Sequence, residues 1–160
     1  MDVFLTLAEV AVAMAGFSAI VVMFKRRASG VWRKIDADRF HGMVLHAIFA
    51  TVFALLPFAF TLFAVSDAEA LRWCCGLLGV ATVVQVVAAS RLESTSGLWI
   101  RIQIAGGGLL VLTLQAAGAS GAFPEQALGI YFIGVFWHLV QAGMLFVLLV
   151  WIPESLIGPE

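Results

Sequence analysis

The fold is decided by residues 3–24, VFLTLAEVAVAMAGFSAIVVMF, which contain a single charged residue, Glu9. About 20 apolar residues in an α-helix, rising about 1.5 Å each, cross the hydrocarbon core of a bilayer. The stretch is therefore long enough to cross a membrane. It lacks the basic residues that begin a cleavable signal peptide, because the chain starts with Met1-Asp2-Val3. We expect the first element to be a transmembrane helix.

Four more apolar stretches follow, separated by short polar connections. Together with the first, they are residues 3–24, 41–65, 71–90, 99–118 and 127–151. Charged residues make up only 12% of the chain, whereas soluble domains contain about 25%. A soluble fold of this size has no interior large enough for so many apolar side chains. The sequence therefore predicts an all-α protein, a polytopic transmembrane helical bundle of five spans that forms one domain over residues 1–160.

The fourth stretch, residues 99–118, is the weakest of the five. It holds Gln103, Gln115 and a glycine triplet at 106–108. Glycine lowers helix stability, and polar side chains oppose insertion into lipid. Two alternatives therefore stay open at this stage: a broken or re-entrant segment buried in protein, or a total of four spans.

A proline lies inside the second stretch. Pro57 has no N–H group, so the carbonyl oxygen of Phe53 loses the donor that a regular helix would supply. We expect the second helix to kink at this point.

The basic residues alternate between the two ends of the spans. Six of the nine lie in the first connection, between Lys25 and Arg39, and Arg91 and Arg101 flank the third connection. Only Arg72 lies at the opposite end. Connections rich in Lys and Arg stay in the cytoplasm. This pattern predicts an N-terminus outside the cell and a C-terminus in the cytoplasm.

The first connection has two interpretations. It carries six basic and two acidic residues, a net charge of +4. It either anchors the orientation of the protein or binds anionic lipid headgroups, at about 1 kcal/mol per basic residue. The residues concerned are Lys25, Arg26, Arg27, Arg33 and Lys34.

Glu9 is the one acidic residue inside a span, about two turns from the outer end of the first helix. It lies at the edge of a broad face of small side chains, which lets another helix approach closely. We expect that face to pack against protein and Glu9 to point inward. A carboxyl at this depth is an ion or proton site or lines a pore. The alternative is a carboxyl bonded to a neighbouring helix or reaching the outer interface. The small face includes Ala11, Ala15, Gly16 and Ala19.

The fifth stretch carries a polar stripe. Tyr131, Gly134, His138 and Gln141 recur at i, i+3, i+7 and i+10 and therefore share one helical face. Tyr131 lies at a depth similar to that of Glu9, so a contact between the first and fifth helices would satisfy several of these groups together. The stripe predicts either a proton relay through His138 or a seam of interhelical hydrogen bonds, each worth about 0.6 kcal/mol.

His46, on the cytoplasmic half of the second stretch, is a further candidate for an intramembrane polar site. His41 lies at the mouth of the same helix but on another face, so the two do not form a metal pair. No HExxH or CxxC pattern, phosphate-binding loop or Ser-His-Asp arrangement occurs. Cys74 and Cys75 are adjacent and cannot bridge within a helix. We expect no enzyme activity, no metal, no cofactor and no nucleic-acid partner.

Two segments resemble a known group of proteins. Residues 8–18, AEVAVAMAGFS, followed by Arg26-Arg27, Trp32 and Asp38-Arg39, look like the first helix and basic, Trp-containing loop of an uncharacterised family of small bacterial multi-span membrane proteins. Residues 131–137, YFIGVFW, resemble the last helix of that group. The resemblance implies a bacterial inner membrane and no particular activity.

Three functions remain open. The first is a homo-oligomeric channel with Glu9 near the ion path, because one protomer has too few helices to enclose a wide path. The second is a non-catalytic scaffold or partner subunit whose polar residues are structural. The third is a proton-coupled transporter, which the absence of two matching halves disfavours.

Overall fold

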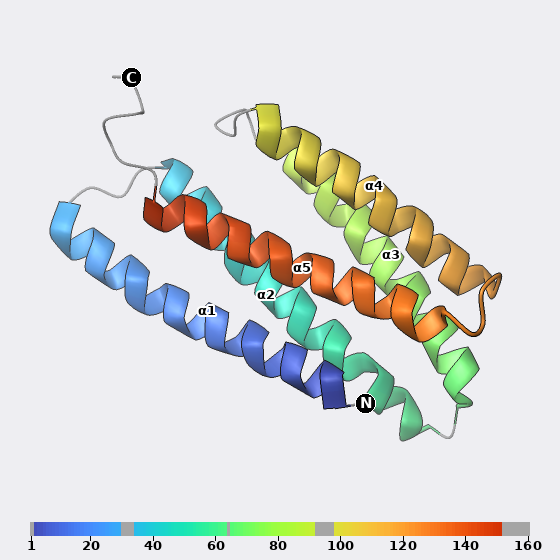
Figure 1. Cartoon of the computed structure of the whole chain (residues 1–160). Helices are drawn as coiled ribbons and strands as arrows, with labels where there is room; N and C mark the ends of the chain where they lie inside the picture. Colours follow the sequence, from blue (N-terminus) through green and yellow to red (C-terminus); the bar gives the residue numbers. More distant parts are fainter. Residues whose placement is uncertain (1, 30–33, 64, 92–97, 152–160) are drawn as a thin grey trace.

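The chain is described by a computed structural model over residues 2–29, 34–63, 65–91 and 98–151, without the side chains of 25–29, 88–91, 98–104 and 151. Within these residues the regular structure is helical throughout (Figure 1). The all-α prediction is confirmed. The helices are α1 (Asp2–Ser29), α2 (Lys34–Thr61), α3 (Asp67–Arg91), α4 (Leu98–Ser120) and α5 (Ala127–Trp151).

The second helix differs most from the predicted bounds of 41–65. It begins at Lys34, seven residues before the predicted start. Hydropathy detects only the apolar part of a helix, whereas charged residues can also form its backbone hydrogen bonds. It ends at Thr61, where the N–H groups of Leu62 and Phe63 bond to carbonyl groups three residues back. Such tight bonds close the last turn of a helix and satisfy its free carbonyls.

Four helices are long and apolar enough to cross a membrane: α1, α2, α3 and α5. In α4 the apolar part with described side chains is shorter, Ala105–Ser120. The helix nevertheless runs without a break through the glycine triplet at 106–108. A broken fourth segment is therefore not what the chain forms. The structure is compatible with a multi-pass membrane protein.

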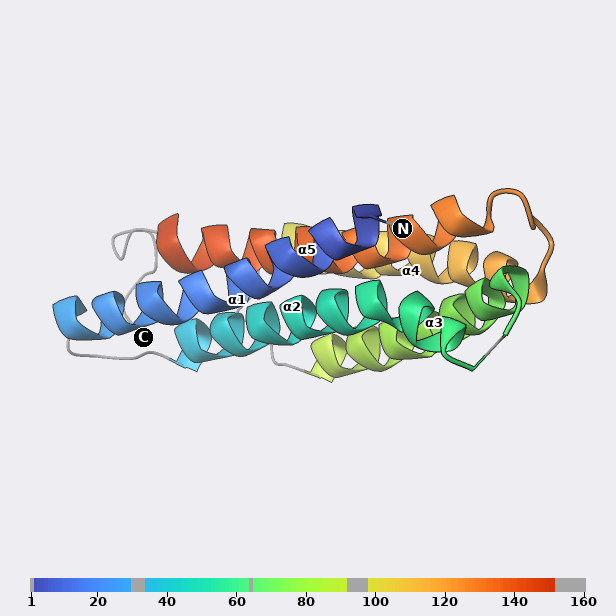
Figure 2. The same cartoon turned by 90° about the horizontal axis from the view of Figure 1, so that it is seen from below.

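The helix α5 occupies the centre of the bundle. It contacts each of the other four helices, whereas α1, among the residues that the structure describes, contacts α2 and α5 alone. Helices α3 and α4 form a hairpin that packs beside α5 (Figures 1 and 2). Side chains on α5 that face inward are consequently surrounded by protein on several sides.

Helices α2 and α5 are antiparallel, and three of the contacts between them are seven residues apart along α2. Arg39 donates from Nη1 to the carbonyl of Leu148 at 3.1 Å, and His46 lies against His138 further along. Phe53 then meets Tyr131 near the start of α5. Seven residues are close to two helical turns, so these positions share one face of α2.

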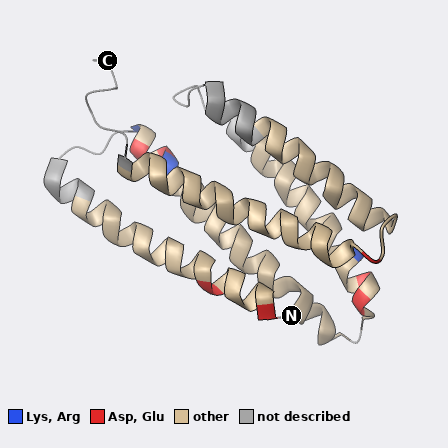
Figure 3. Ribbon diagram, viewed as in Figure 1, with Lys and Arg blue, Asp and Glu red and all other residues tan. Residues whose placement is uncertain are grey.

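The apolar core has two parts, one toward each end of the bundle. One part surrounds Tyr131 and draws on α1, α2, α3 and α5. The other lies nearer the end of α5 and includes Met43 and Leu149. The outer surface of α1, α3 and α4 is apolar as well, with Val12, Val80 and Leu109 each more than half exposed. Charged residues with described side chains, Glu9 excepted, lie near helix ends or in a connection (Figure 3).

Candidate functional site

The polar stripe of α5 lies inside the bundle. Tyr131, His138 and Gln141 are each at most 1% exposed, and Gly134 is buried with them. The stripe faces inward because α5 is the central helix. The partners of its side chains come chiefly from α2.

Tyr131 satisfies the carbonyl group that Pro57 leaves without a donor. Its hydroxyl donates to the oxygen of Phe53 at 2.5 Å, four residues before the proline. The ring also packs against Phe4 of α1, with ring centroids 5.6 Å apart. Since a buried carbonyl without a donor is unfavourable, this bond explains how the α2 helix continues through Pro57.

His46 and His138 form a pair across the α2–α5 interface. Their Nδ1 atoms lie 3.3 Å apart, so one carries the proton and donates to the other. Phe49, one turn after His46, stacks on the His138 ring with centroids 5.8 Å apart. The His138 side chain is 1% exposed. Two imidazole groups, one of them fully buried and the other partly buried, are thus held in hydrogen-bond contact.

Polar atoms beside this pair remain without partners. His138 Nε2 and both amide atoms of Gln141 are buried and have no hydrogen bond within the described residues. An unpaired buried polar group costs about 1–3 kcal/mol, and such groups are rare in native proteins. Gln141 follows His138 by three residues on the same face of α5. The centre of the bundle therefore holds a group of buried polar atoms whose hydrogen bonds the described residues do not complete.

A second polar contact joins α4 to α5. Gln115 donates from Nε2 to the carbonyl of Ile130 at 2.8 Å. The close approach of the Gln115 side chain to α5 requires a glycine at position 134. A Cβ there would lie 2.6 Å from Leu78 Cδ2 and closer still to Gln115 Nε2. Gln115 thus fixes how α4 packs on the central helix.

Glu9 points away from the bundle, so the expectation that it points inward within the single chain is wrong. Phe4, Ala11 and Ser18, spaced by seven residues, are fully buried, and Glu9 lies nearly opposite them on α1. Helical spacing fixes the angles between residues but not which part of a broad face meets a neighbour. Of the predicted packing residues, Ala11 is buried, Ala15 is partly buried, and Gly16 and Ala19 are exposed.

The predicted polar contact between α1 and α5 is likewise not made by Glu9. Phe4 of α1 meets Tyr131 through an apolar ring contact, and the carbonyl that accepts the Tyr131 hydroxyl lies on α2. The exposed carboxyl group of Glu9 lies on the side of α1 that faces away from the bundle.

The basic connection has little described geometry. Lys34 is exposed at the start of α2. The side chains of Lys25, Arg26 and Arg27, and all of Arg33, lie outside the described residues. Headgroup binding by this connection stays a prediction.

The part of the chain that the structure describes contains neither a cluster of metal ligands nor a disulfide. No group of three His, Cys, Asp or Glu residues there is placed to hold a metal ion. Cys74 and Cys75 are buried, unbridged thiols of the apolar core.

The chain was compared with protein-family models, with curated proteins and with solved structures. It matches none of them.

Proposed function

We propose that this protein is a multi-pass component of a bacterial inner membrane whose copies associate into a cation-permeable assembly. Its N-terminus lies outside and its C-terminus in the cytoplasm. Four long apolar helices support the membrane setting. The concentration of basic residues in two connections supports the orientation.

The position of Glu9 carries the proposal. It lies in the apolar segment Asp2–Phe24 of α1, seven residues or about 10 Å along the helix from Asp2. Its side chain is exposed, and no described residue donates a hydrogen bond to it. A carboxylate facing hydrocarbon is strongly unfavourable. Further copies of the chain, or water in a path between copies, would remove that penalty.

The surface around Glu9 suits close packing of a second helix. Ala13 and Gly16, one and two turns further along α1, are also exposed. A Cβ added at Gly16 would meet no atom within 4 Å. Small side chains allow two membrane helices to approach closely. Symmetric copies would then bring several Glu9 carboxylates together, and rings of acidic residues favour the passage of cations.

Ion flux in liposomes tests the conducting role of Glu9. We expect the wild type to pass cations and Glu9→Gln to lose most of that flux. Asp2→Asn is the matched control, because it removes the same charge from the end of the same helix. Wild-type liposomes without flux, or equal flux through Glu9→Gln, would contradict the proposal in favour of a non-conducting scaffold or partner subunit.

Mass measurement in lipid nanodiscs tests self-association. Gly16→Leu places a large side chain on the proposed contact, and Gly129→Leu places the same side chain on α5. Neither glycine has an atom within 4 Å of an added Cβ, so the single chain tolerates both changes. We expect Gly16→Leu alone to reduce assembly. A monomeric wild type would rule out the oligomeric path.

The His46–His138 pair favours a second candidate function, proton transfer through the protein. Imidazole can accept a proton at one ring nitrogen and release one from the other. The contact of 3.3 Å and the unpartnered Nε2 of His138 offer a route through the α2–α5 interface. Proton uptake by dye-loaded liposomes tests this function. His46→Gln should reduce uptake and His41→Gln, an exposed residue on the same helix, should not.

A further inference from the structure

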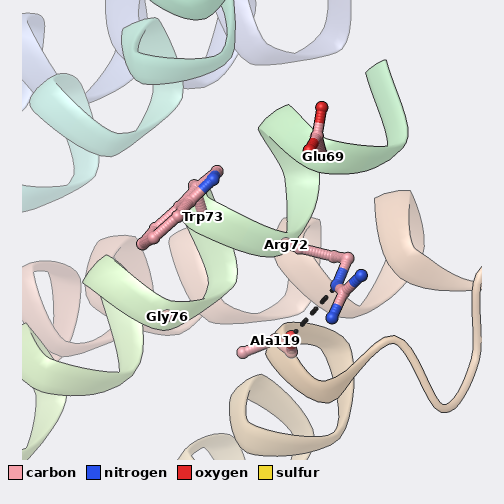
Figure 4. Close-up of a pocket in the computed structure, with 5 residues that line it drawn as sticks. All are labelled: Glu69, Arg72, Trp73, Gly76 and Ala119. Atoms are coloured by element: carbon pink, nitrogen blue, oxygen red, sulfur yellow. Dashed lines mark hydrogen bonds between the residues drawn. The ribbon is translucent and has the colours of Figure 1, made fainter. Parts of the chain in front are cut away.

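The hairpin of α3 and α4 has a groove on its surface, made of two adjoining cavities. The first has a volume of about 390 Å³ and is lined by Glu69, Arg72, Trp73, Gly76 and Ala119 (Figure 4). The second, of about 220 Å³, is lined almost entirely by apolar groups that include Gly79, Val83 and Ala116. Gly76 and Ala119 line both cavities. The two cavities therefore adjoin along the hairpin surface, and together they are named the α3–α4 groove.

Small residues create the groove. Gly76 and Gly79 of α3 lie opposite Ala116 and Ala119 of α4. A Cβ added at Gly76 would be 3.9 Å from the Cβ of Ala119, which is ordinary contact. Position 76 thus has room for a side chain that would fill the groove without a clash at its first atom.

One end of the groove is charged. Arg72 donates from Nε to the carbonyl of Ala119 at 3.3 Å and from Nη2 to that of Ser120 at 3.5 Å. These bonds hold the guanidinium at the C-terminal end of α4, and its Nη1 has no acceptor among the described residues. Figure 4 shows the carboxylate of Glu69 and the guanidinium of Arg72 pointing apart. The two opposite charges form no ion pair with each other in the described structure.

The other end of the groove is apolar, and its length matches one leaflet of a bilayer. Glu69 and Val83 are 14 residues apart on α3, which is about 21 Å of helix. Half of a bilayer, headgroups included, is about 20–22 Å thick. Trp73 lies near the charged end and is 63% exposed, and tryptophan is enriched at the headgroup level of membrane proteins. In the membrane setting proposed above, the groove would run from headgroup depth toward the bilayer midplane.

We propose that the α3–α4 groove binds a phospholipid whose headgroup carries a primary ammonium, as phosphatidylethanolamine does. Arg72 holds the phosphate through its remaining N–H groups, and Glu69 accepts hydrogen bonds from the ammonium. One acyl chain lies over the glycines at positions 76 and 79. The described structure gives the Glu69 carboxylate one donor, the hydroxyl of Ser66 at 3.4 Å, and no cation. An anionic headgroup without an ammonium supplies no positive charge to this carboxylate, and a quaternary ammonium has no N–H group to donate. The proposal rests on the membrane setting proposed above and not on self-association or ion flow.

Native mass spectrometry of protein released from vesicles tests this site. The vesicles contain equal parts of phosphatidylethanolamine, phosphatidylcholine and phosphatidylglycerol. We expect the wild type to retain phosphatidylethanolamine and Gly76→Leu to retain about tenfold less, the factor that 1.4 kcal/mol of lost affinity produces. Gly106→Leu is the matched control, since it is an exposed position on α4 with no atom near an added Cβ. Equal retention by Gly76→Leu would overturn the proposal.

A substitution at Glu69, the residue proposed to bind the headgroup ammonium, tests the site without altering the packing of the groove. Glu69→Gln should still retain lipid but lose the preference for phosphatidylethanolamine over phosphatidylglycerol. Asp67→Asn removes a charge from the same helical turn, outside the groove, and should keep that preference. Unchanged preference in Glu69→Gln would overturn the headgroup assignment even if Gly76→Leu failed to fold. Loss of bound lipid from Gly76→Leu, with its cation flux unchanged, would separate this proposal from that of the conducting assembly.

Discussion

Glu9 of α1 and His138 of α5 are both ionisable residues in apolar stretches, and the structure places them in opposite surroundings. His138 lies in the centre of the bundle, against His46 and Phe49. Glu9 lies on the outer surface of α1, opposite the face that packs on α2. The centre around His138 is complete within one chain apart from a few unpaired atoms, whereas the surface around Glu9 requires something further to cover it. A polar residue in a membrane helix therefore indicates either an interior site or an interface, and only the packing distinguishes them.

The largest difference between the two regions should appear when glycine is replaced. Gly134→Val in the interior pushes into Leu78 and Gln115, and we expect a loss of about 3 kcal/mol in the free energy of unfolding. Gly129→Val, on the same helix but exposed, should change it by less than about 0.5 kcal/mol. Thermal unfolding in detergent, followed by circular dichroism, measures both. Equal losses would mean that Gly134 does not lie against Leu78 and Gln115.

Removing the Tyr131 hydroxyl should have the next largest effect. Tyr131→Phe leaves the buried carbonyl of Phe53 without a donor, and we expect it to lower stability by about 2 kcal/mol. In a Pro57→Ala background, the new N–H group at position 57 can bond to that carbonyl, so the same change should cost less. A double-mutant cycle by chemical unfolding in mixed micelles measures this coupling. Additive effects would refute the role given to Tyr131.

The unpaired amide of Gln141 predicts a smaller change in the opposite direction. Gln141→Met removes two buried atoms without partners, and we expect stability to rise by about 1 kcal/mol. Gln115→Met should lower it, because the amide of Gln115 donates to Ile130. Calorimetry of the purified variants compares them. A loss of stability in Gln141→Met would mean that a bound water or ion completes the centre.

The smallest effect is expected at Glu9 itself. In protein dispersed to single chains by dilution in detergent, Glu9→Gln should change the free energy of unfolding by less than about 0.5 kcal/mol, as at other surface positions. In lipid at high protein density, the same variant should alter assembly. Unfolding curves recorded at several protein-to-detergent ratios separate the two conditions. A large effect in single chains would place Glu9 inside the fold, in surroundings like those of His138.

Much of the fold was predictable from local features. The five apolar stretches predicted five helices, since about 20 apolar residues form a helix in lipid. Their ends were less well predicted, as α2 shows by starting at Lys34. The free carbonyl of Phe53 was predictable from Pro57, but its donor was not. One signal for that contact is the seven-residue spacing of His46 and Phe53 on α2, which matches the spacing of Tyr131 and His138 on α5.

The sequence by itself determined which stretches are helical, where charges concentrate, and which residues share a helical face, because each follows from composition or from 100° of rotation per residue. Tertiary structure alone decided that His138 meets His46, that Glu9 faces outward, and that a groove joins Glu69 and Arg72 to the glycines of α3. Those features depend on how each helix is rotated against its neighbours. That rotation is set by side-chain packing between residues far apart in the chain, which no local pattern encodes.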